Sequence, residues 1–311
     1  MDFVLKSRNT IAAILAGKDP RLLLIVGPCS IHDPAAIFDY AVRLKELSEK
    51  LEETFFFVMR AYFEKPRTCH GWKGFLHDPF LDGSHCIDQS LSLTRKLLRS
   101  LIGIKIPLAA EFLDPAAPHY LGDLISWGCV GARTVSSPIH RQMASHLDMP
   151  IAFKNSIDGT LESALWGIEV AKVPHTFMGM NREGRLARVR SKGNPYTHLV
   201  LRGGDKGPNY ESPFIDDTLK RTPCLLVDCA HGNSKKEARG QLHVFEKVLS
   251  QVALGNRGIR GMMLESFLYE GNQSLASPLV YGVSITDPCL DFEATEDLLL
   301  KGAARLQLCA I

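Results

Sequence analysis

Three side chains that commonly bind metals each stand where a run of apolar residues ends. Cys29 closes the first of these runs, His231 directly follows a later one, and Glu265 closes the last. A thiolate, an imidazole and a carboxylate can together hold a transition metal if the fold brings them to one place. Taken singly, Cys29 could be a small buried hydrophobe and His231 a hydrogen-bonded core histidine.

A second group of side chains is cationic and follows the ends of similar runs. Guanidinium forks suit phosphate and carboxylate oxygens, and a lysine adds a point charge. So many like charges in one place would be costly without anions to neutralise them. The sequence therefore predicts substrates with several negative charges, and the alternative is salt bridging to surface carboxylates. The group comprises Arg60, Lys65, Arg67, Arg133, Lys154 and Arg202.

Composition excludes several other classes of protein. The chain has 311 residues, 45% hydrophobic and 23% charged, as in soluble globular proteins. Its 36 basic and 34 acidic residues leave a net charge of +2, which gives no support to nucleic-acid binding. No Cys-x-x-Cys pair, secretory signal or membrane-spanning run is present in the sequence. We expect a cytoplasmic protein with reduced thiols and no membrane partner.

Eight apolar runs alternate with helical stretches, which favours a (β/α)8 TIM barrel over an open doubly wound sheet. Helices are expected at 88–102, 160–172, 234–254 and 293–308, and after the N-cap Asp33 with Pro34 at the first position. We expect one catalytic domain, 1–311, with a short N-terminal segment. The expected barrel strands are 22–29, 55–60, 107–112, 129–133, 150–154, 198–203, 224–230 and 259–265.

One segment interrupts the alternation between the fifth and sixth expected barrel strands. Residues 175–180 and 186–190 flank a polar stretch that contains Gly184, which predicts an inserted β-hairpin over about 175–190. In a barrel the carboxyl ends of all eight strands meet at one face, where active sites are built. The metal-ligating and cationic residues above, together with Glu111, should therefore converge at that face.

Long, unusual strings in the chain resemble a known family over nearly the whole length. The strings include GPCSIHDP (27–34), FVMRAYFEKPRT (57–68), GWKG (71–74), DCAHGNSKK (228–236) and YGVSITDPC (281–289). The chain resembles the microbial type I 3-deoxy-D-arabino-heptulosonate 7-phosphate (DAHP) synthases, of the group regulated by aromatic amino acids. The resemblance implies the first step of the shikimate pathway: phosphoenolpyruvate, erythrose 4-phosphate and water give DAHP and phosphate.

The resemblance also implies roles for individual residues. It adds Asp287 to Cys29, His231 and Glu265 as ligands of one divalent metal ion, and this mixed donor set suits Mn, Fe, Co or Zn. Cys29 and His231 thereby belong to the catalytic group with Lys65, the expected proton donor, whose cationic neighbours should lower its pKa. The phosphoenolpyruvate residues would be Arg60, Lys65, Glu111, Ala132, Arg133, Lys154 and Arg202. The erythrose 4-phosphate residues would be Pro66, Arg67, Thr68 and Asp287.

The resemblance leaves regulation and assembly open. A homodimer or homotetramer is expected, but the first barrel strand begins near residue 22, earlier than in family members whose longer N-terminal extension helps form the dimer and the inhibitor pocket. Phe177 in the hairpin could line such a pocket or could simply pack. Two other functions are considered: a related synthase that uses a pentose phosphate, and a non-catalytic barrel that senses phosphorylated metabolites or aromatic amino acids.

Overall fold

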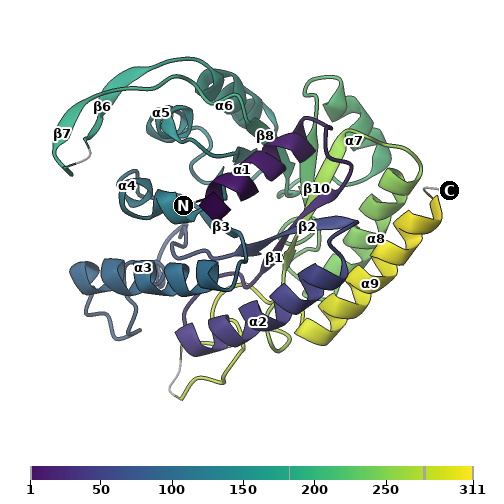
Figure 1. Ribbon diagram of the computed structural model, residues 1–311, viewed down its shortest axis with the longest axis horizontal. Helices are drawn as coiled ribbons and strands as arrows, with labels where there is room; N and C mark the ends of the chain where they lie inside the picture. Colours follow the sequence, from purple (N-terminus) through teal and green to yellow (C-terminus); the bar gives the residue numbers. More distant parts are fainter. Residues whose placement is uncertain (1, 182, 276–277, 310–311) are drawn as a thin grey trace.

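Eight parallel strands close into a barrel in the computed structural model, which describes residues 2–181, 183–275 and 278–309 (Figure 1). The first strand pairs with both the second and the last, so the open-sheet alternative is excluded and the (β/α)8 barrel is confirmed. Around the barrel the strands are β1 (Leu22–Gly27), β10 (Ile259–Glu265), β9 (Leu225–Asp228), β8 (Thr197–Leu201), β5 (Ile151–Lys154), β4 (Trp127–Val130), β3 (Leu108–Glu111) and β2 (Phe55–Arg60).

Helices follow the barrel strands and cover the outside of the barrel. In α2, Asp33 caps the first turn by accepting from the backbone N–H of Ala35 at 2.9 Å, and Pro34 occupies the first helical position, as predicted. The helices are α1 (Asp2–Leu15), α2 (Pro34–Lys50), α3 (Ile87–Gly103), α4 (Ala117–Leu121), the 3-10 turn η1 (Gly122–Leu124), α5 (Pro138–His146), α6 (Glu162–Lys172), α7 (Ser212–Leu219), α8 (Gly240–Ala253) and α9 (Phe292–Cys309).

The N-terminal segment is a helix, α1, which the sequence analysis did not assign. Its buried Ile11 and Ile14 join a cluster with the barrel-interior residues Leu23, Val58 and Trp127. The helix leads directly into the amino end of β1 and lies across the strands in Figure 1. Because α1 packs against this end of the barrel interior, a substrate must enter from the opposite face.

The largest differences from the predicted boundaries occur at β4 and α8. β4 begins at Trp127 rather than at residue 129, and Arg133 lies beyond its end. α8 begins at Gly240 rather than at residue 234, because the preceding segment forms turns with left-handed backbone at His231, Lys235 and Lys236. These residues therefore lie on a loop at the carboxyl end of β9.

The inserted hairpin is confirmed. β6 (Thr176–Met180) and β7 (Leu186–Arg190) pair antiparallel in a separate sheet, and the polar turn between them includes residue 182, which lies outside the described residues. Figure 1 shows this teal hairpin extending away from the barrel beside α5. In the described part of the chain, no helix is both long and apolar enough to cross a membrane.

Candidate active site

Three of the four expected metal ligands meet at the carboxyl face of the barrel. One ligand atom each from Cys29, Glu265 and Asp287 lies within 4.8 Å of the others. β1 and β10 are neighbours with Gly27 in register with Glu265, so Cys29 and Glu265 follow adjacent strand ends. Asp287 comes from the loop after β10. Barrel closure thus joins the two ends of the sequence in a cluster that could hold a metal ion.

His231 stands beside this cluster but is not part of the same tight group. Its Nε2 lies 3.7 Å from Glu265 Oε1, and its Nδ1 lies 3.0 Å from Asp228 Oδ2. A left-handed backbone at His231, with φ of 56°, turns the chain sharply after β9. The imidazole therefore presents one nitrogen toward the cluster and the other toward a buried carboxylate, as metal-binding histidines commonly do.

Arg60 places a buried guanidinium at the floor of the site. Its Nη2 donates to Glu265 at 3.0 Å, its Nε donates to the carbonyl of Pro28, and the group lies 4.0 Å from the ring centre of Tyr62. Its Nη1 is buried without a hydrogen-bond partner among the described residues. A buried guanidinium N–H without an acceptor is costly, so this atom marks where an anionic ligand would bind.

Lys65 contacts the cluster directly, with Nζ 3.0 Å from Cys29 Sγ and 3.1 Å from its carbonyl oxygen. Burial acts to lower the pKa of Lys65, but negative charge at Cys29, Glu265 and Asp287 outweighs it and raises the pKa above the usual value. The expectation of a lowered pKa was therefore wrong. It counted the cations near Lys65 in the sequence and missed the closer thiol and carboxylates.

Two further residues of the expected phosphoenolpyruvate group lie deep in the barrel mouth. Lys154 ends β5 and pairs with Asp228 at 3.0 Å, with both side chains buried. Glu111 ends β3 and packs against Gly131, where an added Cβ would fall 1.9 Å from Glu111 Oε1. Only glycine at position 131 leaves room for the Glu111 carboxylate. This carboxylate therefore lies beside the backbone that leads to Arg133.

Arg67 and Thr68, two of the four residues expected for erythrose 4-phosphate, line an open hollow of about 470 Å³, whereas Asp287 does not. Arg133 Nε donates to Thr68 Oγ1 at 3.0 Å, and Arg67 Nε donates to the carbonyl oxygen of Trp72 at 2.8 Å. Pro66 is half-buried and directly precedes Arg67 in the chain, but it does not line this hollow. The residues that line the hollow are Arg67, Thr68, Ala132, Arg133, Ser156, Ile157 and Asp158.

Some residues of the site were not selected from the sequence. Asp228 ends β9 three residues before His231, and that spacing was the available signal. Ser156, Ile157 and Asp158 belong to the loop after β5, and nothing in their types distinguished them from ordinary loop residues. Arg202, which was selected, lies just after β8 with Nη1 donating to the carbonyl oxygen of Gly203 at 3.2 Å.

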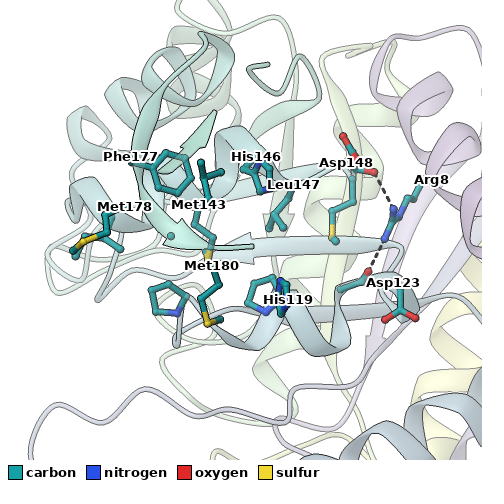
Figure 2. Close-up of a pocket in the computed structure, with 17 residues that line it drawn as sticks. Arg8, His119, Asp123, Met143, His146, Leu147, Asp148, Phe177, Met178 and Met180 are labelled. Carbon is teal, nitrogen blue, oxygen red and sulfur yellow. Dashed lines mark hydrogen bonds between the residues drawn. The ribbon is translucent and has the colours of Figure 1, made fainter. Parts of the chain in front are cut away.

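A second hollow, also of about 470 Å³, lies between the hairpin and helices α4 and α5 (Figure 2). Phe177 of β6 lines it and meets His146 edge-on at 6.2 Å between ring centres. Arg8 of α1 borders it and donates to backbone carbonyls, including those of Gly122 at 2.6 Å and Asp148 at 3.1 Å. The hairpin, α1 and the outer helices therefore enclose a space whose lining includes none of the expected catalytic residues.

Comparison with known proteins decides the family. The model of the DAHP synthetase I family matches residues 2–300. The chain belongs to this family. A protein of Escherichia coli (strain K12) named phospho-2-dehydro-3-deoxyheptonate aldolase, Tyr-sensitive, is 48% identical over 94% of this chain and 85% of its own length. A Corynebacterium glutamicum protein named phospho-2-dehydro-3-deoxyheptonate aldolase is 41% identical over 97% of this chain and 86% of its own length.

A solved structure supports the same family assignment. The phospho-2-dehydro-3-deoxyheptonate aldolase of Francisella tularensis SCHU S4 superposes with a TM-score of 0.97 at 43% sequence identity. The match covers 99% of this chain and 92% of that one. The Cys29–Glu265–Asp287 cluster at the barrel mouth is thus the candidate catalytic site of this member of the DAHP synthetase I family.

Proposed function

We propose that the chain is a DAHP synthase, which condenses phosphoenolpyruvate with D-erythrose 4-phosphate and water to give DAHP and phosphate. This is the first step of the shikimate pathway to the aromatic amino acids. The observation that carries the proposal is the buried Nη1 of Arg60, which lacks a partner within the described residues and adjoins the Cys29–Glu265–Asp287 cluster. An anionic substrate there would lie against residues able to hold a metal.

The two substrates would occupy the two parts of the site. Phosphoenolpyruvate is assigned to the deep part and to the adjoining edge of the hollow at Ala132 and Arg133. The phosphate of erythrose 4-phosphate is assigned to the same hollow at Arg67 and Thr68, with Pro66 next to Arg67 in the chain. Asp287 would lie at the aldehyde end. A cationic lining allows two anions to approach each other closely enough to react. The residues assigned to phosphoenolpyruvate are Arg60, Lys65, Glu111, Ala132, Arg133, Lys154 and Arg202.

Cys29, His231, Glu265 and Asp287 are the proposed ligands of one divalent metal ion, which suits Mn, Fe, Co or Zn. When bound, the ion supplies Lewis acidity at the aldehyde carbonyl. Lys65 Nζ lies 3.0 Å from Cys29 Sγ and is the proposed donor of a proton to the former aldehyde oxygen.

The bonds change in the following order. The methylene carbon of phosphoenolpyruvate bonds to the aldehyde carbon, and positive charge develops at the neighbouring carbon. Water adds to that carbon, and one of its protons replaces the proton that Lys65 gave to the former aldehyde oxygen. The carbon–oxygen bond to phosphate then breaks, the second water proton leaves with the phosphate, and the carbon becomes the ketone of DAHP. The guanidinium of Arg60 and the ammonium of Lys154 hold the phosphoenolpyruvate anion in position through these steps.

Steady-state kinetics on EDTA-treated protein test this proposal. Protein reloaded with one metal at a time should release phosphate and form DAHP from erythrose 4-phosphate, and metal-free protein should not. Preference for arabinose 5-phosphate would instead indicate the pentose-phosphate synthase. Tight binding of phosphoenolpyruvate by metal-replete protein without turnover would indicate the non-catalytic sensor.

A second proposal concerns the hollow beneath the hairpin, which we infer to bind an aromatic amino acid that inhibits the enzyme. Relatives carry the descriptions Tyr-sensitive and Trp-sensitive, and here Phe177, Met143 and Met180 offer an apolar lining beside polar groups of α1 and α5. Adding Phe, Tyr and Trp separately to the assay tests which of them inhibits.

The Phe177→Ala variant should weaken inhibition while leaving the uninhibited rate unchanged. Leu186→Ala is the matched control, because Leu186 lies on the same hairpin, is 73% exposed and does not line the hollow. Equal sensitivity of both variants to the inhibitor would argue against this site.

A homodimer or homotetramer stays a prediction, which light scattering on the purified protein would test.

A further inference from the structure

Asp228 is a buried carboxylate that touches both parts of the proposed site. Its Oδ2 lies 3.0 Å from Lys154 Nζ and 3.0 Å from His231 Nδ1, and its side chain is fully buried. Lys154 belongs to the phosphoenolpyruvate group, and His231 belongs to the metal-ligand group. We propose that Asp228 is a positioning residue that sets both the orientation of the His231 ring and the place of the Lys154 ammonium. The inference rests on the proposed function.

The backbone holds Asp228 in place independently of these two partners. Its Oδ1 accepts from the backbone N–H of Ala230 at 3.1 Å, and its carbonyl oxygen accepts from Asn233 Nδ2 at 2.9 Å. Asp228 is also the last residue of β9, so the sheet fixes the start of its side chain. The carboxylate is therefore a rigid reference point, whereas His231 lies on a loop and Lys154 has a long, flexible side chain.

For His231, the carboxylate decides which ring nitrogen carries the proton. An ionised carboxylate only accepts hydrogen bonds, so its position beside Nδ1 favours the tautomer with hydrogen on Nδ1. The lone pair of Nε2 then faces Glu265 Oε1, 3.7 Å away, on the side of the metal-type cluster. At 3.0 Å the two atoms are close enough for a hydrogen bond, but the N–H of Nδ1 is not directed at Oδ2 here, and rotation of the ring would direct it there.

For Lys154, Oδ2 of Asp228 balances the positive charge of an ammonium that would otherwise be buried without an anion. The ammonium is buried at the end of β5, with the ring centre of Tyr62 5.8 Å away. A buried ammonium without an anion is strongly destabilising and would move toward water or lose its proton. Asp228 thus keeps Lys154 charged and in place before phosphoenolpyruvate binds.

The Asp228→Asn substitution separates these roles from a purely structural one, because Asn has nearly the same shape. Its NH2 group can face Nδ1 and favour the wrong tautomer, and its neutral amide no longer balances Lys154. We expect the Kd for Mn²⁺, measured by calorimetry on EDTA-treated protein, to rise about 10- to 100-fold. The Kd for phosphoenolpyruvate should rise as well, and the thermal midpoint of the metal-free protein should fall, because the buried Lys154 ammonium loses its anion.

Two control variants sharpen the result. Lys154→Met should weaken phosphoenolpyruvate binding but leave the Mn²⁺ Kd within a few-fold of wild type. Asp217→Asn removes an exposed carboxylate, 75% accessible and paired with Lys220, and should alter neither affinity. An Asp228→Asn variant with unchanged Mn²⁺ affinity would overturn the proposal, as would one that loses thermal stability but binds both ligands normally.

A measurement on the wild-type protein covers the case in which Asp228→Asn does not fold. Long-range ¹H–¹⁵N spectra of the metal-free protein, recorded above the pH range of histidine titration and assigned with His231→Gln, report the tautomer directly. Hydrogen on Nδ1 supports the proposal, and hydrogen on Nε2 overturns it. Wild-type protein that binds no metal and forms no DAHP would instead refute the proposed function on which the inference rests.

Discussion

His198 is a buried histidine inside the barrel whose surroundings suit only the neutral ring. Its Nε2 accepts a hydrogen bond from Trp127 Nε1 at 3.0 Å, and its Nδ1 lies 3.2 Å from the carbonyl oxygen of Tyr196. Burial away from water lowers the pKa of His198 to about 4. Protonation at Nε2 would set two N–H donors against each other, so acid should destabilise this part of the barrel.

The size of the effect follows from the folded and unfolded pKa values. In the unfolded chain His198 regains its ordinary pKa of 6.5, whereas in the folded protein the pKa is about 4. Between these values the unfolded state binds the extra proton, so the free energy of unfolding falls as the pH falls. At about 1.4 kcal/mol per pH unit, the loss approaches roughly 3 kcal/mol at the lower end. Above pH 6.5 this loss is absent.

Urea unfolding of wild-type and His198→Gln protein across this pH range isolates the contribution, because the two proteins share all other titrating groups. Gln can still accept from Trp127 Nε1 but does not titrate. The stability advantage of the wild type should therefore shrink by about 1.4 kcal/mol per pH unit as the pH falls. Both proteins are treated with EDTA, so that metal binding does not add its own pH dependence. A difference independent of pH would refute a neutral, buried His198.

Three further substitutions test the site and the packing around it. Cys29→Ala should abolish stoichiometric metal binding, measured by elemental analysis, together with DAHP formation; an active variant with full metal content would show that the thiol is not a ligand. Arg67→Ala should raise KM for erythrose 4-phosphate about 10- to 100-fold and KM for phosphoenolpyruvate much less, and equal increases would contradict the divided site. Gly204→Ala should lower the free energy of unfolding in urea by about 1–3 kcal/mol, because the added Cβ would lie 2.2 Å from Gly159 N; unchanged stability would mean that the loops separate without cost.

The barrel strands could be predicted closely because parallel strands that are buried on both faces have nearly continuous apolar sequences. β2 and β10 have the predicted boundaries, 55–60 and 259–265. The helix boundary at 234 was wrong because left-handed residues in the preceding loop depend on contacts between loops. There, Gly232 and Gly203 approach so closely that an added Cβ on Gly232 would lie 2.6 Å from the carbonyl carbon of Gly203. Apolar periodicity carries no information about such contacts.

The helix α1 was missed for a related reason. Val4, Ser7, Ile11 and Ile14 are buried at helical spacing, but one of the four is polar and interrupts the apolar stripe. Its stability comes from packing against the barrel interior, which a local pattern does not record. The end of a strand, by contrast, can be recognised from the local sequence. The closed barrel then places the carboxyl ends of paired strands such as β1 and β10 next to each other. That is why Cys29 and Glu265 could be paired from positions so far apart in the chain.

The ion pairs within the site could not be predicted from the sequence. The cationic residues indicated anionic substrates on the assumption that protein carboxylates do not balance their charge. In the structure Glu265 pairs with Arg60 at 3.0 Å and Asp228 pairs with Lys154 at 3.0 Å, so part of that charge is already balanced by the protein. The groups left to bind a ligand have fixed directions. They are Nη1 of Arg60, which has no hydrogen-bond partner in the described part of the chain, and the exposed guanidinium groups at the hollow. Substrate recognition would therefore depend on which donors lack acceptors, and that follows from the geometry of buried pairs rather than from the number of charges.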